Sequence, residues 1–83
     1  MRHARSDALD QLESLLVELR RVPALTERSR GVFYLRSTAF LHFHEDPSGL
    51  FADVRAGDEF ERLPVTTPEQ RQALLGVVAR RLV

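Results

Sequence analysis

The hydrophobic positions near the start of the chain are spaced as in an amphipathic helix. Residues three and four apart share one face of a helix, so we predict a helix from Ser6 to about Arg21. Pro23 lacks an amide hydrogen and ends it. Val17 points away from the apolar stripe, and we expect it to be partly exposed or to contact a partner. The residues of the stripe are Leu9, Leu12, Leu15, Leu16 and Leu19.

After Gly31 the leucine spacing gives way to aromatic and β-branched residues, which are typical of strands. We expect residues 23–30 to be a connector. The turn at Asp46-Pro47-Ser48-Gly49 is the clearest in the sequence, because proline and glycine both favour turn conformations. Pro64 indicates an edge strand, since proline cannot donate to a neighbour. The predicted strands are 32–36, 39–45, 50–55 and 59–65.

The last element is predicted as a helix from Pro68 to about Leu82. Thr67 can cap it, and Gln70 can complete a capping box. One apolar stripe on each helix and one apolar face on the strands must bury each other. We therefore predict a single α+β domain, residues 1–83, with residues 1–5 loose. Its fold is a two-layer sandwich in which a three- or four-stranded antiparallel meander lies between the two helices in sequence.

Two arguments give different registers for the central hairpin. The turn residues favour a three-residue loop, which would place His42 opposite Val54. The hydrophobic pattern favours a register shifted by one residue, with His42 opposite Asp53. In this second register Leu41, Phe43, Leu50, Ala52 and Val54 share the core face. We favour the second arrangement because burial usually decides register.

The most informative polar residues are His42 and His44 on the second predicted strand. Alternate residues of a strand share a face, so the two side chains lie about 6.5–7 Å apart along it. Two imidazoles can hold a divalent transition metal if a carboxylate such as Asp53 completes the site. Solvated histidines on the polar side of a strand explain the same pattern without any function. His3 falls in the segment expected to be loose, so the sequence places no third histidine here.

Composition narrows the classes of function. The chain has no cysteine, which excludes thiolate chemistry and favours the cytoplasm. It shows no apolar segment typical of a signal peptide or a membrane span. The formal net charge is zero, so we do not expect nucleic acid as a partner. If nucleic acid does bind, the candidate residues are Arg20, Arg21, Arg28, Arg30 and Arg36.

The aromatic residues of the predicted sheet outnumber the positions that two short helices can cover on one face. We expect Phe40 and Phe51 to remain on an open face, and an exposed apolar patch usually marks an interface. With Val17 they are the interface candidates, and a homodimer is the commonest form. The leading interpretation is thus a non-catalytic binding or protein-interaction domain that self-associates. The alternatives are a metal or small-ligand site at His42 and His44, or weak nucleic-acid binding; no catalytic residue and no cofactor is predicted.

Three stretches, residues 31–35, 41–47 and 50–55, make the chain resemble small conserved hypothetical proteins of high-GC bacteria, a resemblance that implies no activity. The order of helix, meander and helix is also similar to frataxin-like domains, which bind iron through acids on the first helix and an edge strand. That similarity implies an acidic face, although Arg20 and Arg21 interrupt it. Its residues would be Asp7, Asp10, Glu13 and Glu18.

Overall fold

The computed structural model describes all 83 residues and shows an α+β fold. Its helices are α1 (Ser6–Gln11), α2 (Glu13–Arg20) and α3 (Pro68–Arg81). Its strands are β1 (Arg2–His3), β2 (Leu25–Ser29), β3 (Val32–Leu35), β4 (Thr38–Asp46), β5 (Gly49–Ala56) and β6 (Glu59–Pro64).

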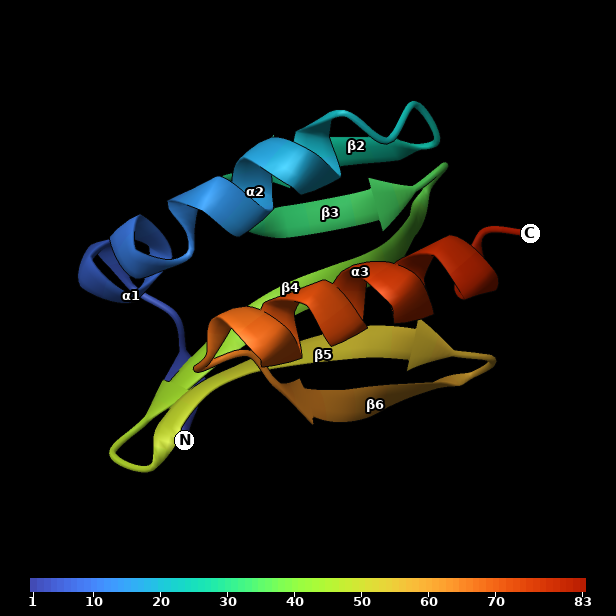
Figure 1. The fold of residues 1–83 in the computed structure, drawn as a ribbon. Coiled ribbons are helices and arrows are strands. Elements are labelled where there is room, and N and C mark those ends of the chain that lie inside the picture. Colours follow the sequence, from blue (N-terminus) through green and yellow to red (C-terminus); the bar gives the residue numbers. More distant parts are fainter.

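Strands β2 to β6 form an antiparallel meander in sequence order, and β1 pairs with β4 beyond the end of β3. All three helices lie on the same face of this sheet (Figure 1). The predicted two-layer sandwich is therefore confirmed, with more strands than expected. Pro64 lies in the edge strand β6, also as predicted.

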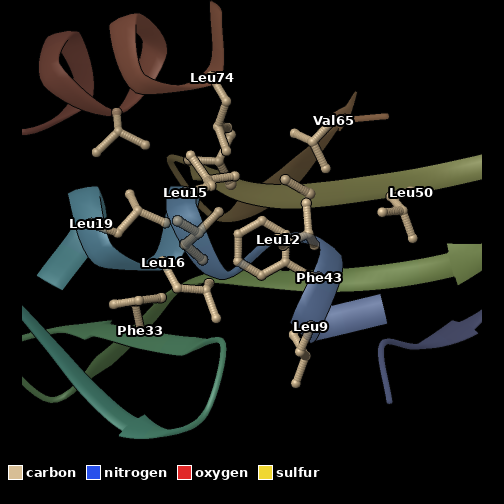
Figure 2. Close-up of a cluster of buried hydrophobic side chains, with 14 of the residues drawn as sticks. Leu9, Leu12, Leu15, Leu16, Leu19, Phe33, Phe43, Leu50, Val65 and Leu74 are labelled. Carbon is tan, nitrogen blue, oxygen red and sulfur yellow. The ribbon is translucent and has the colours of Figure 1, made fainter. Parts of the chain in front are cut away.

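The core lies between the helices and the covered face of the sheet. Leu12, Leu16 and Leu19 have no exposed surface. Figure 2 shows this leucine stripe against Phe33 and Phe43 of the sheet, with Leu74 of α3 nearby. Full burial of one such side chain contributes about 1.5–3 kcal/mol, so the stripe supplies much of the force that holds the layers together.

The last helix begins as the sequence predicts. The Thr67 hydroxyl accepts a hydrogen bond from the Gln70 amide, and the Gln70 side chain accepts one from the Thr67 amide. Each bond satisfies a backbone donor that has no partner inside the helix. The capping box thus fixes where the chain leaves β6 and turns back over the sheet.

The central hairpin has the register that the hydrophobic pattern favours. Its pairs include Asp46 with Gly49 and His42 with Asp53, so the loop contains Pro47 and Ser48 alone. The three-residue loop suggested by the turn residues is wrong. Because the covered face is buried, the apolar residues decide which way every side chain of the hairpin points.

The first part of the chain differs from the prediction in two ways. The helix expected over 6–21 is divided at the fully buried Leu12, whose ψ of 4° departs from the helical value. The expected connector contains strand β2, whose Leu25 is buried and pairs with Leu35. The polar Glu27 faces the helices in this strand. For this reason the strand does not show a regular alternation of apolar and polar residues in the sequence.

The segment expected to be loose is also ordered by pairing. Arg2 and His3 form β1 and lie opposite Glu45 and His44 of β4. The Ala4 amide donates to the Phe43 carbonyl at 3.0 Å. The edge of β4 beyond the end of β3 is free to form these hydrogen bonds. A two-residue strand carries too little pattern to be predicted from sequence.

The expectation that Phe40 lies exposed on the open face is wrong. Strand β3 pairs Phe33 with Leu41 and Tyr34 with Ala39, so Phe40 is the extra residue of a β-bulge. Its side chain is 3% exposed and belongs to the hydrophobic core. The bulge therefore removes Phe40 from the interface candidates.

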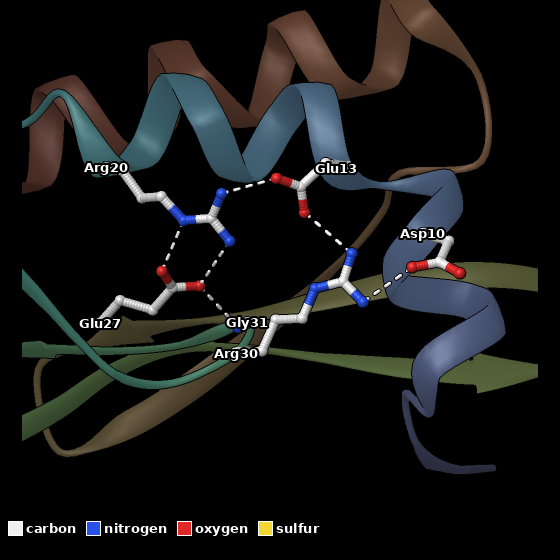
Figure 3. A network of polar contacts seen from close by, with 6 residues as sticks. All are labelled: Asp10, Glu13, Arg20, Glu27, Arg30 and Gly31. Carbon is white, nitrogen blue, oxygen red and sulfur yellow. Dashed lines mark hydrogen bonds and ion pairs between the residues drawn. The ribbon is translucent and has the colours of Figure 1, made fainter.

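A network of charged groups joins the helices to the β2–β3 hairpin (Figure 3). Arg20 donates to Glu13 at 2.6 Å and to Glu27 at 2.5 Å, and Arg30 donates to Glu13 at 2.8 Å. Glu27 also accepts the Gly31 amide at 2.9 Å. Gly31 has a φ of 79°, and a Cβ there would lie 2.7 Å from Leu9 Cδ2. Helix α1 can therefore approach this turn closely only over a glycine.

We predict that Gly31→Ala destabilises the protein more than Gly57→Ala. Both glycines have positive φ, so each substitution carries the backbone cost of about 1–2 kcal/mol. At Gly57 a Cβ meets nothing within 4 Å, whereas at Gly31 it displaces Leu9. The expected difference in free energy of unfolding is roughly 1–3 kcal/mol, measured by urea denaturation. Equal losses would show that Leu9 moves aside without cost.

We also predict that acid weakens the network in Figure 3. Hydrogen bonds from Arg20 and then Arg30 lower the pKa of Glu13 below its ordinary 4.5. Burial raises the pKa of Glu27, but hydrogen bonds from Arg20 and Gly31 outweigh it and the net shift is downward. Groups lowered on folding add stability that is complete above about pH 4.5 and is lost as pH falls through the lowered values.

The measurement is the urea midpoint as a function of pH for wild type and Glu27→Gln. The glutamine keeps the shape of the side chain but does not titrate. The variant is expected to be less stable near neutral pH, and the gap is expected to narrow below about pH 4.5. A gap that stays constant between neutral and acid pH would contradict a contribution from the ionised Glu27.

Candidate metal centre

The face of the sheet opposite the helices carries polar and aromatic side chains in transverse rows. Pairing between the strands sets these rows, because residues opposite one another project to the same side. One row joins Arg55 with Phe60, the next joins His42 with Asp53 and Arg62, and the third joins His3 with His44, Phe51 and Pro64. The two histidines of the sequence prediction thus share this face with Asp53.

The structure adds a third histidine to the pair predicted from sequence. The rings of His3 and His44 are stacked with centroids 4.6 Å apart, and those of His42 and His44 are 5.0 Å apart. One nitrogen from each of the three rings lies within 4.8 Å of the others. These are all the histidines of the chain, and we call them the histidine cluster.

Asp53 lies beside His42 and His44 and is held by Arg62. The guanidinium donates to Oδ1 at 2.7 Å and to Oδ2 at 2.8 Å, and Asp53 is only 7% exposed. The hydrogen bonds from Arg62 lower the pKa of Asp53, although partial burial opposes the shift. The carboxylate therefore stays ionised at neutral pH, and its position is fixed.

Asp53 Oδ2 lies 3.2 Å from His44 Nε2 and 3.5 Å from His42 Nε2. The contact with His44 does not have the direction of a hydrogen bond, and His44 Nε2 is a buried nitrogen with no hydrogen-bond partner. A buried polar atom without a partner costs about 1–3 kcal/mol. This nitrogen is the feature of the open face that most needs an explanation.

Burial lowers the pKa of both His42 and His44, while the charge of Asp53 opposes the shift. The positive charge of Arg62 adds to the lowering at both rings. Both imidazoles are therefore neutral near pH 7. A neutral imidazole has one nitrogen with a free lone pair, which is the form that binds a metal ion.

The donor set suits a four-coordinate transition metal. Ligand atoms 2.0–2.1 Å from a tetrahedral zinc ion lie about 3.3 Å apart. The distances from Asp53 Oδ2 to the two Nε2 atoms are close to that value. The third nitrogen, from His3, lies within 4.8 Å of a nitrogen of each of the other two rings. The three imidazoles and the nearby carboxylate of Asp53 are thus candidate metal ligands, and the sequence predicts all of these candidates except His3.

No protein-family model, curated protein or solved structure matches this chain.

One side of the cluster is formed by Phe60. Its ring lies edge-on to His42 with centroids 4.9 Å apart, and the Arg55 guanidinium lies 4.7 Å from the same ring. Phe60 remains 38% exposed. It shields one side of His42 from water, which contributes to the burial that lowers the pKa of that ring.

The interface candidates do not form one surface. Val17 is 36% exposed but lies on α2, on the helical side of the molecule. Phe51 is half-buried in the third row of the open face, and Phe40 is in the core. Self-association through the open face stays a prediction, and of its three candidates Phe51 alone lies on that face.

The arginines proposed for nucleic-acid binding also do not form one surface. Arg20 and Arg30 are bonded to acids in the network of Figure 3, and Arg21 pairs with Glu18. Arg28 lies 4.1 Å over the Tyr34 ring, and Arg36 is exposed in the β3–β4 turn with a φ of 57°. Nucleic-acid binding stays a prediction without a continuous basic surface to support it.

Three of the four acids implied by the frataxin-like similarity are paired with arginines, whereas Asp7 has no ion pair. Asp10 and Glu13 pair with Arg30, and Glu18 pairs with Arg21. The histidine cluster is the only group of three or more potential metal ligands in the chain. None of the helices is both long and apolar enough to cross a bilayer.

Proposed function

We propose that this protein binds one divalent transition-metal ion between His3, His42, His44 and Asp53. The observation that carries the proposal is the buried, unpartnered Nε2 of His44 beside two further imidazoles and a fixed carboxylate. A metal ion at the centre gives this nitrogen a partner. It also compensates the cost of keeping three rings together on one face.

The chemistry of the ligands indicates which ions are preferred. Nitrogen ligands with one carboxylate suit zinc, cobalt and nickel, whereas calcium and magnesium prefer sites made of oxygen alone. The chain has no cysteine, whose thiolate favours soft ions such as copper(I) and cadmium. We therefore expect zinc to be the strongest physiological candidate, with cobalt(II) as its spectroscopic substitute.

A fourth protein ligand makes this a closed site. Structural zinc sites have four protein ligands, whereas catalytic sites keep one position for water or substrate. With Asp53 Oδ2 as the fourth ligand, the ion joins β1, β4 and β5 and takes no substrate. This favours a binding or structural role over catalysis.

The first prediction for the site concerns stoichiometry and affinity. We expect wild type to bind one cobalt(II) ion with the intense visible bands of a four-coordinate site, followed by absorption and calorimetric titration. Replacing both strand ligands, His42→Gln with His44→Gln, should weaken binding by at least about 100-fold. Loss of a residue that only orients a ligand typically weakens metal binding by about 10–100-fold. At 100 times the dissociation constant, zinc should stabilise wild type by about 2.7 kcal/mol.

Phe60→Leu is the matched control, because leucine keeps an apolar side chain beside His42 and, like phenylalanine, offers no ligand atom. It should bind cobalt with nearly the affinity of wild type. Circular dichroism checks that each variant is folded. The proposal fails if wild type shows no saturable binding, or if the double variant binds as wild type does.

The second prediction concerns the fourth ligand. Because Asp53 closes the site, adding azide to cobalt-loaded wild type should leave the visible spectrum unchanged. Asp53→Ala removes the carboxylate and should make the spectrum sensitive to azide, since a solvent position opens. An azide-sensitive wild type would show an open site with three histidine ligands, and Asp53 would then be an outer partner.

A further inference from the structure

The third histidine reaches the cluster from a separate part of the chain. His42, His44 and Asp53 all lie on the β4–β5 hairpin, whose pairing is fixed by the core. His3 lies on β1, which contributes no residue to the core. The position of this ligand therefore depends on whatever keeps the segment Arg2–Ala4 on the edge of β4.

Backbone pairing alone gives this segment little hold. Strand β1 has two residues, and beyond it the Ala4 amide donates to the Phe43 carbonyl. Exposed backbone hydrogen bonds at the end of a sheet open easily. Ala4 packs against the core, and the Met1 ammonium pairs with Asp46 at 3.5 Å, but neither contact lies at His3 itself.

Glu45 holds the segment by side-chain hydrogen bonds on both sides of His3. Its Oε1 accepts from Arg2 Nη2 at 2.9 Å and from Arg2 Nε at 3.2 Å, while its Oε2 accepts the Arg5 amide at 2.7 Å. One carboxylate thus holds the chain on both sides of His3. Glu45 follows His44 on β4, so the residue that docks the segment adjoins the ligand that His3 must meet.

We infer that Glu45 is a positioning residue for the metal site: it docks the segment Arg2–Ala4 so that metal binding and docking of this segment stabilise each other. The inference rests on the proposed metal function. His3 can bind the metal only when its segment is docked. The metal must therefore favour docking by the same factor by which docking raises the affinity for the metal. The segment is then a movable ligand arm on an otherwise rigid two-histidine site.

A double-mutant cycle on cobalt affinity tests this inference. Glu45→Gln should weaken cobalt binding by about 10-fold, as other partners that orient a ligand do. In the His3→Ala background the same substitution should have no further effect, because there is no third ligand left to position. Glu18→Gln, which loses an ion pair with Arg21 on the helical side, is the control and should bind as wild type.

The outcomes separate the two proposals. If wild type binds no cobalt, both fail. If wild type binds cobalt, two results would overturn the role of Glu45 alone. One is that Glu45→Gln binds cobalt as tightly as wild type. The other is that this substitution weakens cobalt binding equally in the presence and absence of His3. Glu45→Ala, which removes both attachments, should weaken binding at least as much as Glu45→Gln, and a smaller effect would also overturn the role.

Amide hydrogen exchange gives a direct measure of docking. Saturating zinc should slow exchange at Ala4 and Arg5 by the same factor by which His3→Ala weakens zinc affinity. In His3→Ala, zinc should leave these two amides unchanged. Protection that does not respond to zinc in wild type would show that the segment is docked independently of the metal.

Discussion

Burial of one face of the sheet is the constraint from which the site follows. The leucines of α1 and α2 require an apolar surface, and Leu41, Phe43, Ala52 and Val54 supply it. Once these residues face the helices, alternation sends His42, His44 and Asp53 to the other side together. A slip of one residue would bury the histidines in the core and expose the phenylalanine, at a cost of many kcal/mol. The hydrophobic core therefore determines the geometry of a polar site that it never touches.

The sequence predicts those parts of the fold in which local pattern and burial agree. The α3 helix combines a capping box at Thr67 with an apolar stripe, and both are confirmed. The register of the β4–β5 hairpin was the harder case, because turn chemistry and burial disagreed and burial prevailed. Strand β2 was missed since its inward Glu27 binds Arg20 of the opposing helix. A charge satisfied by a distant partner has no signature in the local pattern.

The candidate site was predictable only in part for the same reason. His42, His44 and Asp53 are related by strand alternation and hairpin pairing, which sequence can propose. His3 joins them through pairing across forty residues, and its segment has no apolar periodicity of its own. Phe40 shows the complementary error: alternation alone places it outward, but a single bulge against β3 turns it into the core. Long-range pairing and local irregularities of the sheet are thus the two features that the sequence did not reveal.

The electrostatics of the open face narrow the choice of partner for His44 Nε2. If both ring nitrogens carried protons, the ring would be charged, and both burial and the nearby charge of Arg62 lower its pKa. If Nε2 alone carried the proton, the ring would be neutral, but the contact with Asp53 Oδ2 at 3.2 Å does not have the direction of a hydrogen bond. If Nε2 carries a lone pair, it lacks a donor, because the guanidinium of Arg62 is turned to Asp53. In each of these forms Nε2 has no hydrogen-bond partner. Because Arg62 already balances the charge of Asp53, the proposed cation would be held at His44 by the free electron pair of a neutral imidazole.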